Sequence, residues 1–336
     1  MPELQCVYKE RETAIINDKQ TSFQFRSFSL KDKAFIDSYT KPWMPECSDM
    51  SFANLFIWGS EGKMQFAERD NHLFIKLNFP GVPVYFWAPI PKFGVETNYR
   101  KAVYDAIEYM TSFSVEPTFR SVSEPFYSLM QEHCPELHAT PTDIAWDYVY
   151  ERESLATLSG KKLHGKRNHI NKFLSRYPNY EYKPLTTDLI EACIALYDQW
   201  TEDKDVGNAA FSDERKSVLL ALNNLEALGL VGGTIFVEDN LIAFTVGERL
   251  LPHIQLIHIE KANFEYEGVF PMINQQYILH ECEGVVLVNR EEDMGIAGIR
   301  KAKHSYNPVK MIEKYMFGTR DLTSVEGLWK AKWHSQ

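Results

Sequence analysis

The sequence has only five cysteines, and none stands in a CxxC pair or at a zinc-ligand spacing from a histidine. Scattered thiols in odd number are typical of proteins in a reducing compartment and not of a disulfide framework. GxSxG, P-loop, GxGxxG and HExxH motifs are absent as well, so nothing points to the hydrolase, nucleotidase or zinc-protease chemistry that these motifs carry. We therefore expect a cytoplasmic protein without a metal site.

Long apolar runs are also missing. No stretch reaches the 18 apolar residues of a membrane span, and Val84–Ile90 is strand-sized and followed by proline. The N-terminus lacks the charged and apolar regions of a signal peptide. A net charge of −10 disfavours wholesale binding to nucleic acid or to an anionic bilayer. We expect a protein that is not integral to a membrane.

What the chain does have is length and aromatic content. Its 336 residues, 13% of them aromatic, suffice for two hydrophobic cores. Each half shows the order helix, hairpin, strand, helix, strand, without regular alternation of strand and helix. This pattern predicts an α+β fold with mixed, mostly antiparallel sheets flanked by helices. The join falls near Asp147–Tyr150, which gives domains 1–148 and 149–336. Because no Pro/Gly/Ser linker follows, we expect close packing of the two domains.

The individual elements follow from periodicity and turn residues. In the first half the pattern predicts a hairpin (63–68 and 72–78), a helix (99–112) and a strand (118–122). In the second half it predicts a hairpin (234–237 and 241–246), strands at 254–260, 285–289 and 310–317, and a helix (268–282).

A basic helix opens the second half. Residues 154–180 contain no carboxylate, and the cations would face outward from an apolar stripe. Such a concentration of positive charge favours a phosphate-bearing ligand, although docking on acidic residues of the other domain, or plain solvation, would also explain it. The candidate phosphate-binding residues here are Lys161, Lys162, Lys166 and Arg167.

The strand at 254–260 carries a candidate proton acceptor. Strict alternation would place His258 and Glu260 on one face, so that both share one cleft. Either side chain there would deprotonate an amine nucleophile. A buried or paired structural role is the alternative.

A third candidate is the polar segment 289–308. Glu291, Glu292 and Asp293 would receive an ammonium group, and Asn289 and Tyr306 are further candidate substrate-binding residues. Arg300, Lys301 and Lys303 would hold a phosphate or a carboxylate. The alternative is a surface loop whose opposite charges neutralise one another.

Several strings resemble one known family. Asp147–Tyr150, Leu158–Lys162, Lys166–Phe173 and Asn289–Lys303 are similar to the phosphatidylglycerol lysyltransferase C-terminal-like family, in particular its soluble stand-alone members. The resemblance spans residues 20 to 318. It implies two tandem GNAT-like (acyl-CoA N-acyltransferase) domains and transfer of an aminoacyl group from tRNA to a lipid or peptidoglycan acceptor.

The chain departs from CoA-dependent GNAT enzymes at one loop. Their pyrophosphate loop is rich in glycine, whereas Glu260–Gly268 has one of those glycines and several acids, which repel a pyrophosphate. The leading hypothesis is therefore an acyltransferase of aminoacyl type, with aminoacyl-tRNA as donor and with tRNA and lipid headgroups as candidate partners. The alternatives are an acetyl-CoA-dependent N-acetyltransferase, with acyl-CoA as donor, and a non-catalytic binding module.

Overall fold

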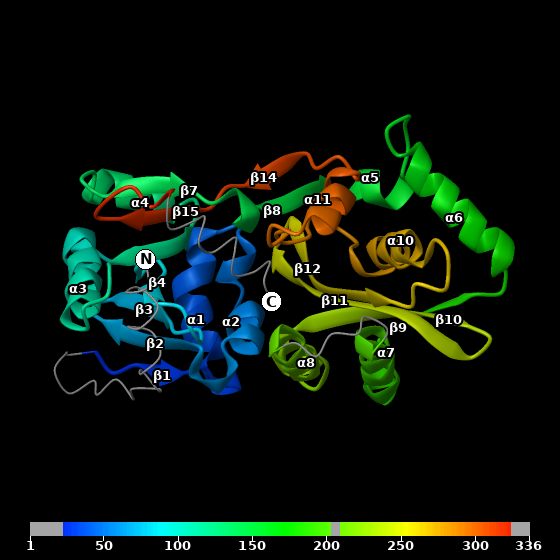
Figure 1. The fold of residues 1–336 in the computed structure, drawn as a ribbon, viewed down its shortest axis with the longest axis horizontal. Coiled ribbons are helices and arrows are strands. Elements are labelled where there is room, and N and C mark those ends of the chain that lie inside the picture. Colours follow the sequence, from blue (N-terminus) through cyan, green and yellow to red (C-terminus); the bar gives the residue numbers. More distant parts are fainter. Residues whose placement is uncertain (1–22, 203–208, 324–336) are drawn as a thin grey trace, which may run out of the picture.

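The structure is a computed structural model and describes residues 23–202 and 209–323. Figure 1 shows two mixed β-sheets side by side, with helices between them and on their faces. The predicted α+β class is confirmed.

The first sheet has the order β1-β2-β3-β4-β6-β15-β7, with β5 paired to β3. Its neighbours are antiparallel except for β4 and β6, which run parallel. The strands are β1 (Arg26–Ser27), β2 (Met64–Arg69), β3 (His72–Leu77), β4 (Tyr85–Phe86), β5 (Ile90–Pro91), β6 (Thr118–Val122), β7 (His138–Pro141) and β15 (Tyr315–Gly318).

The second sheet repeats this plan in the order β14-β8-β13-β12-β11-β10-β9. Here β12 and β13 are the parallel pair. The strands are β8 (Asp147–Glu151), β9 (Glu181–Pro184), β10 (Leu230–Val237), β11 (Asn240–Leu251), β12 (Ile254–Ala262), β13 (Leu287–Asn289) and β14 (Lys310–Ile312).

Helices cover both sheets. The first half contributes α1 (Lys33–Thr40), α2 (Phe52–Trp58), α3 (Tyr99–Ser112) and α4 (Phe126–His133); the second contributes α5 (Arg152–Thr157), α6 (His164–Arg176), α7 (Ile190–Glu202), α8 (Ala209–Leu222), α9 (Leu225–Leu228), α10 (Val269–Glu281) and α11 (Ala297–His304). Helix α10 covers one face of the second sheet, and α7 and α8 lie on the other (Figure 1). Helix α2, capped by the Ser51 hydroxyl, lies between the two sheets and packs on α8.

The chain passes from one sheet to the other at β8 and returns at β15. Strand β8 follows β7 in the chain but lies between β13 and β14 of the second sheet, and β15 follows β14 but lies between β6 and β7 of the first. The chain therefore crosses between the sheets twice, through residues 142–146 and through Glu313–Lys314.

These two crossings change two predictions. The single strand predicted at 310–317 is wrong, because the chain leaves one sheet after Ile312 and joins the other at Tyr315. The predicted boundary between residues 148 and 149 falls inside β8, and β15 returns to the first sheet. A single cut in the chain therefore does not separate the two sheets.

Candidate active site

The parallel strands β12 and β13 diverge at the centre of the second sheet. They pair at three positions, ending with Leu256 opposite Asn289, and β12 then continues to Ala262 while β13 ends. Beyond the last pair lie Glu260, four residues after Leu256 on β12, and Arg290, directly after β13. We call this divergence the strand split.

A β-bulge lies on β12 beside the split. Val246 of β11 pairs with Ile259, but the next residue, Gly247, pairs with Ile257, so His258 is the extra residue. The bulge interrupts the alternation on which the prediction for His258 and Glu260 rested. Glu260 bonds to Asn274 of α10, whereas His258 bonds to Glu248 and Glu291. The prediction that the two side chains share one cleft is wrong.

The residues around Glu260 form what we call the Arg290 cluster. Glu260 accepts hydrogen bonds from Arg290 Nη2 at 3.1 Å and from Asn274 Nδ2 at 3.0 Å. Near the Tyr306 ring centre lie Arg290 Cζ at 4.9 Å and Lys166 Nζ at 4.0 Å. The cluster thus consists of Lys166, Glu260, Asn274, Arg290 and Tyr306.

Two polar atoms of this cluster have no hydrogen-bond partner in the described part of the chain, Arg290 Nη1 and Asn274 Oδ1. Both are buried, Asn274 with only 1% of its surface exposed. Buried polar atoms are normally paired, so each one left open calls for an explanation. Both side chains bond to Glu260 through a nitrogen atom, so a polar ligand next to this carboxylate would satisfy the two open atoms.

Lys166 is the third uncommitted group. It makes no ion pair with any residue in 23–202 or 209–323. Its burial and the neighbouring Arg290 lower the pKa of Lys166 to about 8. The cluster therefore holds two cations and one carboxylate.

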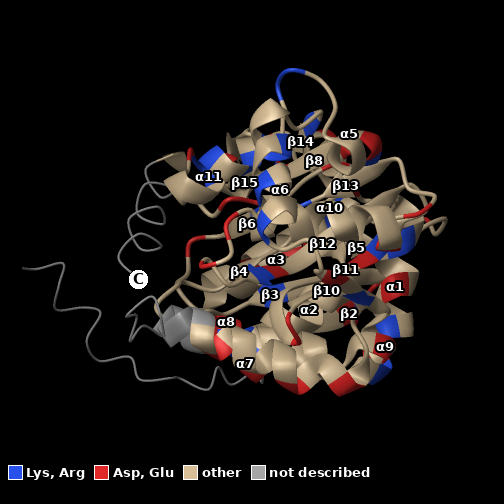
Figure 2. Ribbon diagram, turned by 90° about the vertical axis from the view of Figure 1, so that its right-hand side faces the viewer, with Lys and Arg blue, Asp and Glu red and all other residues tan. Residues whose placement is uncertain are grey.

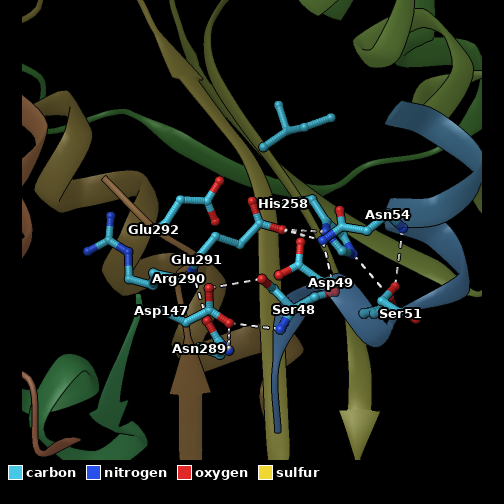
Figure 3. Close-up of polar contacts among 12 residues, drawn as sticks. Ser48, Asp49, Ser51, Asn54, Asp147, His258, Asn289, Arg290, Glu291 and Glu292 are labelled. Atoms are coloured by element: carbon cyan, nitrogen blue, oxygen red, sulfur yellow. Dashed lines mark hydrogen bonds and ion pairs between the residues drawn. The ribbon is translucent and has the colours of Figure 1, made fainter. Parts of the chain in front are cut away.

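His258 is the centre of a separate network on the other side of the bulge. Its Nδ1 lies 2.9 Å from Glu291 Oε1 and its Nε2 lies 3.1 Å from Glu248 Oε1 (Figure 3). Ser51 donates to Glu248, and Asn54 donates to Glu291 at 3.1 Å. We call these five residues the His258 network; it joins α2 of the first half to β11 and β12 of the second.

This network holds the imidazole in its charged form. Burial opposes the charge, but the hydrogen bonds that the ring donates to the two carboxylates outweigh it and raise the pKa of His258 to about 9. An imidazolium has no free lone pair. His258 is therefore built to join the two halves and not to take a proton at neutral pH.

The region where the chain crosses between the two sheets has its own ion pairs. Lys314, in the second crossover, lies 2.8 Å from Asp147 at the start of β8 and 2.7 Å from Asp49. Asp147 also accepts from the backbone N–H of Ser48 and from Asn289 Nδ2 (Figure 3). Lys314 is 1% exposed, and the carboxylates around it raise its pKa despite the burial. Asn289 is thus occupied in holding the two halves together.

The predicted ammonium site, Glu291 to Asp293, already has internal partners. Glu291 bonds to His258, and Asp293 accepts from Tyr148, from Arg300 Nε at 2.7 Å and from the Gly295 N–H. Glu292 has Lys314 at 3.9 Å, and burial raises the pKa of Glu292 to about 7. Only Asp293 is neutralised within the segment, by Arg300, whereas Glu291 and Glu292 face His258 and Lys314, which lie outside it.

Of the three basic residues predicted to hold a phosphate or a carboxylate in this segment, Arg300 and Lys303 already have partners inside the protein. Lys303 donates to the backbone carbonyls of Arg290, Glu291 and Glu292. Arg300 pairs with Asp293 and lies 3.5 Å from Asp143. Lys301 is exposed on α11.

The basic helix α6 lies against the loop that starts α10. Lys172 and Arg176 both pair with Glu267, at 3.0 and 2.9 Å. The His169 carbonyl packs against Gly268, the residue before α10. Lys161 and Lys162 are exposed, and Arg167 donates to the carbonyls of Leu158 and Gly160.

The surface around α6 and α11 differs in charge from the opposite side. In Figure 2 basic residues gather on α6 and α11 in the upper part of the molecule, whereas acidic residues follow α7 and α8 below. The predicted basic surface is thus present. Of its candidate residues, Lys166 reaches the Arg290 cluster.

Sequence reasoning assigned no role to Asn274, Arg290 or Glu248. Asn274 had a signal that was available: it is a polar residue on the face of α10 that also carries Tyr277 and Ile278, both buried. Glu248 carried no comparable signal, because its role depends on the bulge of β12 and on contact with α2.

Comparison with a solved structure shows the class of fold. A crystal structure of L-PGS from Bacillus licheniformis matches 89% of this chain and 96% of its own, with a TM-score of 0.61 at 13% identity. At that identity the likeness shows the fold. The predicted tandem arrangement of two GNAT-like halves is confirmed.

The family follows from the sequence itself. The model of the family described as "Phosphatidylglycerol lysyltransferase, C-terminal" matches residues 43–318, and the chain belongs to this family. Family and fold together support an acyltransferase of the lysyl-phosphatidylglycerol synthase or GNAT type.

Two further similar proteins are of unknown function. A conserved protein from Bacteroides thetaiotaomicron is 34% identical, matches 89% of this chain and all of its own, and has a TM-score of 0.79. A protein of Mycoplasmoides gallisepticum is 27% identical over 172 residues, 51% of this chain. The match spans about half, 55%, of that curated relative.

Two features are absent from residues 23–202 and 209–323. No helix there has the length and apolar character needed to cross a bilayer. Within the same ranges no three His, Cys, Asp or Glu side chains are grouped so as to hold a metal ion.

Proposed function

We propose that this protein is an acyltransferase of aminoacyl type, which moves an aminoacyl group from tRNA to an amine or hydroxyl acceptor at the strand split. One observation carries the proposal: the buried Arg290 Nη1 and Asn274 Oδ1 stand open beside Glu260. Family and fold support acyl transfer in general.

The chemistry needs a proton acceptor and a stabiliser of the carbonyl oxygen. As the acceptor's nitrogen or oxygen bonds to the ester carbonyl carbon, its proton passes to Glu260. Arg290 Nη1 donates to the carbonyl oxygen while negative charge grows on it. The bond to the tRNA ribose oxygen then breaks, and that oxygen takes up the proton. Asn274 Oδ1 accepts a hydrogen bond from the amino group of the aminoacyl moiety.

The position of α6 favours an aminoacyl donor over acyl-CoA. A helix N-terminus binds phosphate when its backbone N–H groups are accessible. Here α6 lies over the start of α10, with the His169 carbonyl against Gly268 and with Glu267 paired to Lys172 and Arg176. The acids of this loop add repulsion toward a pyrophosphate. We assign the tRNA backbone to the exposed Lys161, Lys162 and Lys301, with Arg167 placing the loop before α6.

A thermal-shift titration tests the proposal, because a ligand that binds only the native state raises the unfolding temperature with its concentration. Total aminoacyl-tRNA should stabilise the protein and deacylated tRNA should do so less. Arg290→Gln should remove the difference between the two, whereas Arg320→Gln, at an exposed ion pair with Glu116, should keep it. Stabilisation by CoA and not by aminoacyl-tRNA would replace the proposal with the acetyl-CoA alternative. If neither ligand stabilises the protein, the non-catalytic module is the better description.

A further inference from the structure

The charges left uncommitted at the strand split are positive. Arg290 pairs with Glu260, but Lys166 has no ion-pair partner in the described ranges, although it lies half-buried over the Tyr306 ring. A partly buried cation without a counter-ion is costly. The Arg290 cluster therefore has one positive charge in excess, which one negative charge on a ligand would balance.

The same region offers no carboxylate for a basic group. Glu291, Glu292 and Asp293 face His258, Lys314 and Arg300 respectively, and Glu260 is held by Arg290 and Asn274. A lysyl ammonium brought to this place would meet Lys166 and Arg290 at close range. Like charges in a partly buried site repel each other strongly.

We propose that the acyl group bound at the strand split carries a carboxylate, which Lys166 receives, so that the amino acid is aspartate or glutamate. This inference rests on the proposed function. Lys166 is set apart from the exposed Lys161 and Lys162 by its burial beside a carboxylate. A ligand with one negative charge should bind beside Lys166 better than a phosphate dianion, because Glu260 repels the dianion more strongly.

Amides of single amino acids test this directly, since they resemble the aminoacyl group without its tRNA. Glutamate α-amide should raise the unfolding temperature, and glutamine α-amide, which differs only in the missing charge, should bind about tenfold or more weakly. Lysinamide should not stabilise the protein. Lys166→Met should reduce the affinity for glutamate α-amide to that for glutamine α-amide.

The matched control is Lys172→Met on the same helix, whose ammonium pairs with Glu267 on the surface; it should bind glutamate α-amide like the wild type. Equal stabilisation by lysinamide, or equal binding of the two α-amides, would overturn the carboxylate inference and leave the aminoacyl proposal standing. Stabilisation by AMP that Lys166→Met abolishes, without any response to glutamate α-amide, would also overturn it and assign Lys166 to phosphate. A response to CoA alone would instead remove the proposed function itself.

Discussion

His258 shows how one buried side chain joins two halves of a molecule. Both of its ring nitrogens donate to carboxylates, and one of these carboxylates also binds Ser51 on the far side of the interface. The folded protein therefore holds this ring charged with a pKa of about 9, against 6.5 for an ordinary histidine.

The sign of the pH effect follows from that difference. Because folding raises the pKa of His258, its stabilising contribution is complete below pH 6.5 and is lost as the pH rises through 9. The free-energy gap in unfolding between wild type and His258→Gln should shrink by about 3 kcal/mol from pH 6.5 to 9.5. Urea titrations of both proteins at the two pH values measure it. A gap that stays constant would contradict the network as described.

A second prediction concerns the buried ion pairs of Lys314. Lys314→Met leaves the buried Asp147 and the partly buried Asp49 without their counter-ion, which should cost about 3–5 kcal/mol of unfolding free energy. Lys216→Met, which removes an exposed partner of Glu61, should leave the denaturation midpoint nearly unchanged. Similar denaturation midpoints for both variants would show that the ion pairs of Lys314 do not hold β8 and β15 in place.

At the scale of elements, the contact between α6 and α10 depends on Gly268. This residue has a φ of +90°, and a Cβ there would overlap the His169 carbonyl oxygen. Gly268→Ala should destabilise the protein by about 2 kcal/mol or more and lower hydrogen-exchange protection along α6. Gly165→Ala, in the first turn of α6 with open space around it, should instead stabilise by up to about 1 kcal/mol. Equal effects of the two changes would contradict the described packing.

Elements with clear periodicity could be predicted from the sequence. The helix at 99–112 and the strand at 118–122 have the predicted bounds, and both predicted hairpins form. The bulge at His258 could not be predicted from β12 alone, because it arises from the pairing of β12 with β11, where Gly247 stands opposite Ile257. The break at Glu313–Lys314 was hidden for a similar reason: its cause is a buried ion pair with residues far away in the chain.

The candidate site was predicted in part. The sequence pointed to Glu260, Lys166 and Tyr306, which the structure brings together. It also grouped His258 with Glu260 and left Asp293 free for a ligand, because local patterns do not show which charges neutralise one another after folding. Asp293 instead binds Tyr148 and Arg300.

At the scale of the whole molecule, the return of β15 to the first sheet makes the two halves interdependent. A fragment 1–148 lacks β15 from the interior of its sheet, and a fragment 149–336 lacks the start of β8. Neither fragment should show a cooperative thermal transition alone, whereas the two mixed together should regain one, since the second supplies β15 and the first supplies the start of β8. Circular dichroism on the separate and mixed fragments measures this. Independent cooperative unfolding of either fragment would contradict the interdependence of the two halves.

The most direct test of the central claim is acyl transfer itself. Purified protein is mixed with tRNA charged with radiolabelled amino acids and with a mixture of small amine and hydroxyl acceptors, and the label is followed from tRNA into acid-stable product. We predict transfer by the wild type, loss of about a hundredfold or more in rate for Glu260→Gln, and little change for Lys172→Met. Label that remains on tRNA with the wild type, or transfer that Glu260→Gln leaves intact, would contradict the assignment of the strand split as the active site.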